Sequence, residues 1–172
     1  MRLEIVCLTL LSVYSLLSLS INSWFHNVND VYNGTTDPDK NVQLFTNSFQ
    51  ASFAFDILIF VWSLFGFLIA RKSLKYLCYF FCFYLLLLCI GKLVSTSIFL
   101  GNGDVQGINN EFKDQYNSFK NNNQSVPKEF TSWKASYENM YASVILELLL
   151  SGITCFFLIT GAVSPQIQKT AN

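Results

Sequence analysis

The chain has 172 residues, of which 52% are hydrophobic and only 13% are charged. Soluble domains typically carry about 25% charged residues, so this composition excludes an ordinary soluble domain. The formal net charge is zero, which argues against nucleic acid as a partner.

Four long apolar blocks account for the hydrophobic content. They cover residues 3–25, 49–70, 76–100 and 141–163. A helix of about 20 apolar residues crosses the hydrocarbon core of a bilayer, so each block is long enough to span it. The sequence therefore predicts an all-α integral membrane four-helix bundle, a single domain over residues 1–172 in contact with the lipid bilayer. Its loops are residues 26–48 and 101–140.

The first block has two interpretations. Residues 5–19 could be the apolar region of a signal peptide, with Ser18-Leu19-Ser20 as a cleavage site. Against this, Glu4 lies in the segment that should be basic, and the apolar run continues to Trp24-Phe25, which suit a membrane interface. Both interpretations place the next segment outside the cytoplasm.

The basic residues predict the orientation. Arg71, Lys72 and Lys75 crowd the short link between the second and third blocks, and Arg2 and Lys169 lie near the two chain ends. The positive-inside rule places all three regions in the cytoplasm, so both termini are expected there. In the two loops taken together, acidic residues outnumber lysines, in agreement with an outward position. Residues 166–172 show no sorting signal, so plasma membrane and endomembrane both stay open.

Two acceptor triplets predict a glycoprotein. Asn33-Gly34-Thr35 lies in the first loop and Asn123-Gln124-Ser125 in the second. Glycans are added to Asn-x-Ser/Thr triplets on the outer side, so Asn33 and Asn123 are candidate glycosylation sites.

The second loop also carries a helical pattern. Apolar residues recur at i, i+4, i+8 and i+11 from Ile108, and again at helical spacing from Phe130 into the fourth block. Pro127 and the polar residues before it interrupt the pattern. We expect a small extracytoplasmic helical hairpin between the third and fourth spans, with its second helix continuous with span four.

Three ionisable residues lie inside the spans: Asp56 in the second, Lys92 in the third and Glu147 in the fourth. Each costs roughly 2.5–3.5 kcal/mol on insertion scales, so such residues usually face a partner or a cavity. At 1.5 Å per residue, all three are expected roughly 9–12 Å below the outer boundary, in one polar layer. The layer could be a structural ion pair, a site for a ligand, ion or proton, or a contact with a partner's membrane helix.

The five cysteines (Cys7, Cys78, Cys82, Cys89 and Cys155) all lie in apolar blocks, which excludes an outer domain held by disulfides. Cys78 and Cys82 lie beside the basic link, so they are candidates for palmitoylation. The alternative is that they are small apolar helix residues.

Sites for chemistry are not evident. The segment from Asp37 to Lys40 is similar to the start of a calcium loop, but Val42 replaces the required glycine and Ser48 the required glutamate. We find no nucleotide, metal or hydrolase signature. The chain is therefore not expected to be an enzyme or to bind a metal or cofactor.

The layout resembles that of the tetraspanins. These proteins share four spans, a smaller first outer loop, a tiny basic inner loop and a larger helical second outer loop. Glu147 is similar to the acidic or amide residue that they carry in span four. The chain departs from the family in lacking Cys-Cys-Gly and in carrying Lys92 where an acidic or amide residue is usual. The resemblance implies a non-enzymatic organiser that binds other membrane proteins laterally.

Two functions follow as expectations. The first is a structural or adaptor protein, or a subunit of a larger complex, that acts through lateral and outer-loop contacts with other membrane proteins. The alternative is a small channel or transporter component that uses the charged residues inside the membrane. The sequence identifies no small-molecule ligand.

Overall fold

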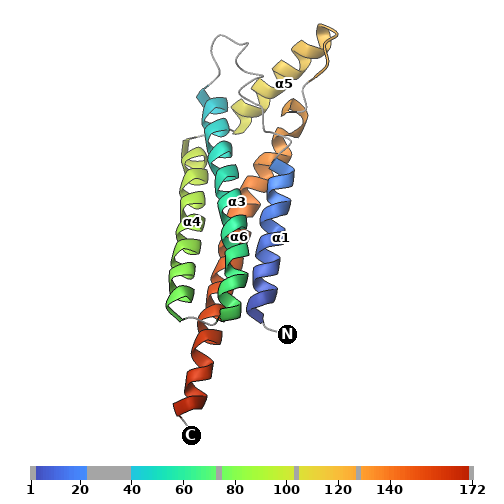
Figure 1. Ribbon diagram of the computed structural model, residues 1–172. Coiled ribbons are helices and arrows are strands. Elements are labelled where there is room, and N and C mark those ends of the chain that lie inside the picture. Colours follow the sequence, from blue (N-terminus) through green and yellow to red (C-terminus); the bar gives the residue numbers. More distant parts are fainter. Residues whose placement is uncertain (1–2, 23–39, 73–74, 103–104, 127–128, 171–172) are drawn as a thin grey trace.

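A computed structural model of the chain describes residues 3–22, 40–72, 75–102, 105–126 and 129–170. Within these ranges every element of regular secondary structure is an α-helix, and residues 122–126 form a turn and a short irregular segment (Figure 1). The helices are α1 (Leu3–Asn22), α3 (Lys40–Lys72), α4 (Lys75–Asn102), α5 (Val105–Asn121) and α6 (Glu129–Thr170). The predicted all-α fold with four long apolar helices is confirmed.

Four of these helices are long and apolar enough to cross a membrane. The apolar windows are Leu3–Asn22, Asn47–Ala70, Tyr76–Ile98 and Tyr137–Gly161, with a mean hydropathy between 1.9 and 2.3. The shortest window has 20 residues, which at 1.5 Å per residue reaches about 30 Å, the thickness of the hydrocarbon core. These helices fit a multi-pass membrane protein.

The four long helices pack as an antiparallel ring. α1 packs against α3 and α6, and α4 packs against the same two helices from the other side. Both chain termini lie at the end of the bundle where α3 connects to α4, and α5 lies at the opposite end (Figure 1). We refer to the latter as the α5 end.

The distribution of polar residues is the reverse of that in a soluble bundle. Large apolar side chains such as Leu17, Val61, Phe83 and Phe156 are more than half exposed on the outside of the helices. The interior contains polar and charged side chains with almost no exposure. Because water favours the opposite arrangement, the exposed apolar surface fits a lipid environment.

The half of the bundle near the termini has an apolar core. Leu8, Ile59 and Phe81 are fully buried there. The Trp62 ring stacks on Phe81 with centroids 5.8 Å apart, and its Nε1 donates a hydrogen bond to the Phe81 carbonyl oxygen, 3.1 Å away. These contacts join α3 to α4 and fix the depth at which the two helices meet.

Helix α3 begins earlier than predicted. Its first residue is Lys40, whereas the apolar block begins at 49, so part of the predicted first loop is helical. Residues 40–48 contain neither glycine nor proline, so nothing in them ends a helix that extends beyond the apolar run.

The segment predicted as a hairpin is helical. α5 ends in a turn in which Asn123 has a φ of 53°. Asn123 N donates to the Lys120 carbonyl at 3.2 Å, and Gln124 N donates to the Phe119 carbonyl at 3.0 Å. This is a Schellman motif, in which asparagine replaces the usual glycine. α6 then runs without interruption into the fourth apolar window. The outward position of this segment stays a prediction.

Candidate functional site: a buried charged layer

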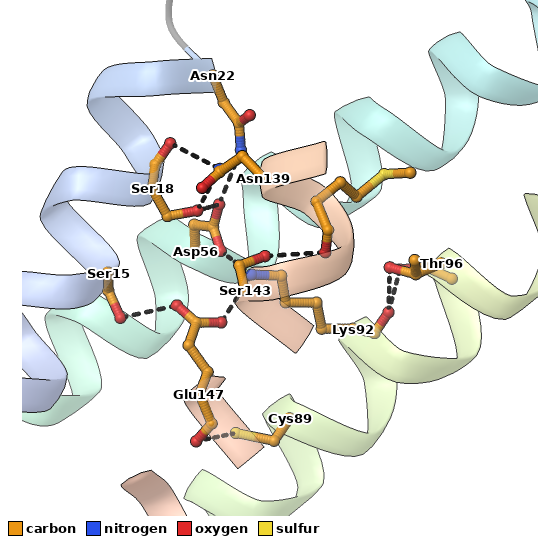
Figure 2. Close-up of polar contacts among 12 residues, drawn as sticks. Ser15, Ser18, Asn22, Asp56, Cys89, Lys92, Thr96, Asn139, Ser143 and Glu147 are labelled. Carbon is orange, nitrogen blue, oxygen red and sulfur yellow. Dashed lines mark hydrogen bonds and ion pairs between the residues drawn. The ribbon is translucent and has the colours of Figure 1, made fainter. Parts of the chain in front are cut away.

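Asp56, Lys92 and Glu147 meet in the interior of the bundle, and we call them the charged layer. Lys92 Nζ on α4 contacts Asp56 Oδ1 on α3 and lies 2.7 Å from Glu147 Oε2 on α6 (Figure 2). The three side chains have relative exposures of 0%, 0% and 1%. The ammonium group therefore bridges two carboxylates from two other helices.

Helix α1 completes the layer with neutral donors. Ser15 Oγ donates to Glu147 Oε1 at 2.9 Å, and Ser18 Oγ donates to Asp56 Oδ2 at 2.8 Å. Asn22 Nδ2 donates to the same Asp56 oxygen at 3.3 Å. Spacings of three and four residues place these side chains on one face of a helix. All four long helices thus contribute to the layer.

The charged layer is stabilised from neighbouring turns of α4 and α6. Thr96 Oγ1 donates to the Lys92 carbonyl oxygen at 2.9 Å. Cys89 Sγ lies 3.2 Å from Ser151 Oγ and 3.9 Å from the Glu147 carbonyl oxygen. Asn139 Nδ2 donates to Ser18 Oγ at 3.1 Å, which links the start of the α6 apolar window to α1.

Sequence reasoning missed several residues of this network, although a signal for them exists. Four buried or half-buried polar residues recur at intervals of four on α6: Asn139, Ser143, Glu147 and Ser151. On α3, buried Ser48, Ser52 and Asp56 follow the same spacing. A polar residue every fourth position in an apolar helix marks the face that turns away from lipid.

The serines closest to the layer differ in what they contact. Ser15 and Ser18 contact its carboxylates. Ser95 Oγ donates to the Lys92 carbonyl oxygen at 2.8 Å. Ser97 is exposed on the outside of α4 and donates to the Leu93 carbonyl oxygen.

Among the residues that the structure describes, two fully buried side-chain atoms have no hydrogen-bond partner. They are Asn22 Oδ1 and Ser52 Oγ, on side chains with 0% exposure. Asn22 contacts Asp56, and Ser52 lies one helical turn from Asp56 toward the α5 end. Buried polar atoms of this kind bind ordered water, so this side of the layer is suited to hydration.

The arrangement differs from a metal centre. In the part of the chain that the structure describes, no cluster of three or more His, Cys, Asp or Glu side chains could hold a metal ion. Within the layer, the Lys92 ammonium group occupies the position between the two carboxylates. The layer therefore supplies its own cation.

Cys78 and Cys82 are buried in the bundle, with exposures of 2% and 4%. The Cys82 thiol lies 4.0 Å from the Cys155 carbonyl oxygen, and the Cys155 thiol lies 3.9 Å from the Cys82 carbonyl oxygen. These positions suit small apolar residues at the contact of α4 and α6. An acyl group would require either thiol to turn outward, and palmitoylation stays a prediction.

The two candidate glycosylation sites differ in what the structure says of them. Asn123 is exposed in the turn after α5. Asn33 lies outside the described residues.

Compared with known proteins, the chain matches no family model, no curated protein and no solved structure. The resemblance to tetraspanins therefore rests on architecture alone. Four long apolar helices are not specific to that family.

Proposed function

We propose that this chain is a non-catalytic multi-pass membrane protein that acts as a structural or adaptor subunit through lateral and outer-loop contacts. The observation that supports the proposal is the closure of the charged layer. Its three charges contact one another and are bonded by side chains from α1, so they tie all four long helices into one unit. A bundle fixed from within leaves its outer surface for contacts with lipid and with other membrane proteins.

The surface of the bundle supports lateral contacts. α6 exposes Ile145, Leu149, Ile153 and Phe156, and α4 exposes Phe83, Leu87, Ile90 and Val94. Lipid covers such faces, and so does the apolar face of another protein's membrane helix. α5 buries Phe112 against the bundle and exposes Lys113 and Asp114, so its polar side is free for outer-loop contacts.

The proposal includes an orientation with both termini in the cytoplasm. Arg71 and Lys72 end α3 and Lys75 begins α4, at the end of the bundle where the termini lie (Figure 1). The acceptor Asn123 lies in the turn that follows α5. The positive-inside rule and the glycan acceptor thus favour the same orientation. A tetraspanin-like organiser would have this arrangement, and the membrane is the plasma membrane or an endomembrane.

Gentle affinity purification from a lipid nanodisc preparation tests the role. We expect a second membrane protein at a stoichiometric ratio. Two variants locate the surface that binds the partner. The first replaces Leu149, Ile153 and Phe156 on the lateral face of α6 by alanine. The second combines Lys113→Glu with Asp114→Lys and alters only the exposed side of α5. Alanine at Leu87, Ile90 and Val94 is the matched control on the other lateral face. A protein that purifies alone in every preparation would contradict the proposal.

A channel or transporter component is the second candidate. The unpaired Asn22 Oδ1 and Ser52 Oγ beside the charged layer favour it, because they extend the polar interior toward the α5 end. Purified protein in liposomes would then conduct ions or protons, and Lys92→Met would change the flux measured per folded protein molecule. Absence of flux together with a stoichiometric partner favours the adaptor.

A further inference from the structure

The charged layer contains one more acid than base. Asp56 and Glu147 face a single ammonium group, that of Lys92, and all three side chains are buried. The other groups facing Glu147 from its neighbouring helices are Ser15 and Cys89, with Tyr14 within electrostatic range. None of these carries a positive charge. With both carboxylates ionised, the bundle would hold an uncompensated negative charge, which is strongly unfavourable in a low-dielectric interior.

A single proton on one carboxylate would make the layer neutral. The hydrogen bonds differ between the two acids, and this difference identifies the proton's position. Asp56 Oδ1 faces the Lys92 ammonium group, and Asp56 Oδ2 accepts from Ser18 Oγ at 2.8 Å and from the Asn22 amide Nδ2 at 3.3 Å. The Ser18 hydroxyl itself already accepts a hydrogen bond from Asn139 Nδ2, 3.1 Å away. Ammonium and amide N–H groups donate and cannot accept, so a proton on either oxygen of Asp56 would meet another donor.

Glu147 has one oxygen without such a donor. Its Oε2 faces Lys92 at 2.7 Å, but its Oε1 faces only the hydroxyl of Ser15 at 2.9 Å. A hydroxyl accepts as readily as it donates. The hydrogen bond between Ser15 Oγ and Glu147 Oε1 can therefore form with the hydrogen on the serine or on the carboxyl group. Glu147 Oε1 is therefore the carboxylate oxygen of the layer that can carry a proton without losing a hydrogen bond.

We propose that Glu147 is a proton-binding site, with an exchangeable proton held on Oε1 toward Ser15, while Asp56 stays ionised against Lys92. This inference goes beyond the adaptor role and does not depend on it. A continuous series of contacts connects the site to the half-buried Asn139, through Ser18, Asp56 and Lys92. The unpaired, fully buried Ser52 Oγ lies beside this series and suits a water that would exchange protons from the α5 end.

Infrared spectroscopy of the full chain at neutral pH, in nanodiscs of ether-linked lipids that have no ester carbonyl, tests the proposal without any substitution. Carboxylic acids exposed to water are ionised at this pH, so a carbonyl band of a protonated acid reports a buried one. We expect such a band in the unlabelled protein. It should shift when glutamate is labelled with ¹³C at its carboxyl group, stay unchanged when aspartate is labelled, and shift again on exchange into D₂O.

Variants test the charge count independently. Glu147→Gln should lose the band. Asp56→Asn should also lose it, because Glu147 then becomes the only anion for Lys92. Lys92→Met should roughly double the band, with contributions from both labelled acids, because no cation remains.

Three outcomes would overturn the proposal. The first is the absence of a protonated band in the unlabelled protein, which would mean that both acids are ionised. The second is a band that responds to aspartate label alone, which would assign the proton to Asp56. The third is a band that does not shift in D₂O, which would show that the proton does not exchange.

Discussion

Ser15 and Glu147 are separated by 132 positions in the chain, yet their side-chain oxygens lie 2.9 Å apart. The contact joins the first long helix to the last. It also places α1 inside the network that satisfies the buried charges, together with Ser18 and Asn22. Removal of α1 would leave Asp56 and Glu147 without their neutral donors and would open one side of the interior to lipid.

This position of α1 predicts that residues 3–22 are retained in the membrane-embedded protein and are not cleaved as a signal peptide. Unmet hydrogen bonds to buried charged groups cost about 1.5–3 kcal/mol each, so a bundle without α1 would be strongly destabilised. Intact-mass measurement of the purified protein should show these residues. Ser15→Ala with Ser18→Ala should lower the melting temperature, whereas Ser20→Ala, at an exposed position, should leave it unchanged. A purified chain that begins at Ile21 would contradict the prediction.

Loss of Lys92 should destabilise the bundle more than loss of all three charges. Breaking a buried ion pair by removing one partner costs up to about 3–5 kcal/mol, while replacing the whole network by neutral side chains is often tolerated. We expect Lys92→Met to lower the thermal stability in nanodiscs, and the triple variant Asp56→Asn, Lys92→Met and Glu147→Gln to recover most of the loss.

The double variant Asp56→Lys with Lys92→Asp, which exchanges the two charges, is a weaker test of whether the charged layer stabilises the bundle. In the exchanged protein, an aspartate at position 92 would face Glu147, so two acids would meet where an ion pair now lies. The single substitution Ser97→Ala, on the lipid-facing side of α4, is the control and should leave stability unchanged. A triple variant no more stable than Lys92→Met would contradict the structural role of the charges.

Gly66 and Gly91 lie where side chains of neighbouring helices approach the backbone closely. A Cβ at Gly66 would lie 2.5 Å from Leu8 Cδ2 and 2.8 Å from Phe81 Cζ, and one at Gly91 would lie 2.6 Å from Phe55 Cζ. Overpacking of this kind typically costs about 1–3 kcal/mol. Gly66→Ala and Gly91→Ala should each reduce thermal stability. Gly152→Ala is the matched control, because a Cβ there meets no atom within 4 Å.

The spans and the polar layer could be predicted because charged residues stand out in long apolar runs. Residue counts alone predict that Asp56, Lys92 and Glu147 lie at one depth in the membrane. Side chains at one depth meet when each also faces the interior of the bundle. Serine is common in membrane helices and hardly changes hydropathy. The periodic serines that show which face of α3 and α6 turns inward are therefore a weak signal.

Other features depend on information that hydropathy does not carry. The start of α3 at Lys40 reflects the helical preference of a polar segment, which an apolar window cannot detect. The network contact of Asn139 and the mutual approach of Cys82 and Cys155 depend on helix rotation and on neighbours distant in sequence. The unpaired Ser52 Oγ is visible only when every partner in space is known.

The turn after α5 should carry a glycan if the α5 end faces outward. Asn123 is exposed and takes a left-handed conformation that closes the Schellman motif, so its own replacement would disturb the turn. Ser125→Ala removes the acceptor triplet while leaving Asn123 in place, and Ser125 is exposed. In a eukaryotic host, endoglycosidase should shift the mobility of the unaltered chain, and Ser125→Ala should remove the part of the shift due to this site. Thr35→Ala separates the contribution of Asn33. A chain whose mobility is insensitive to the enzyme, but which is glycosylated when an acceptor triplet is introduced into residues 71–75, would reverse the proposed orientation.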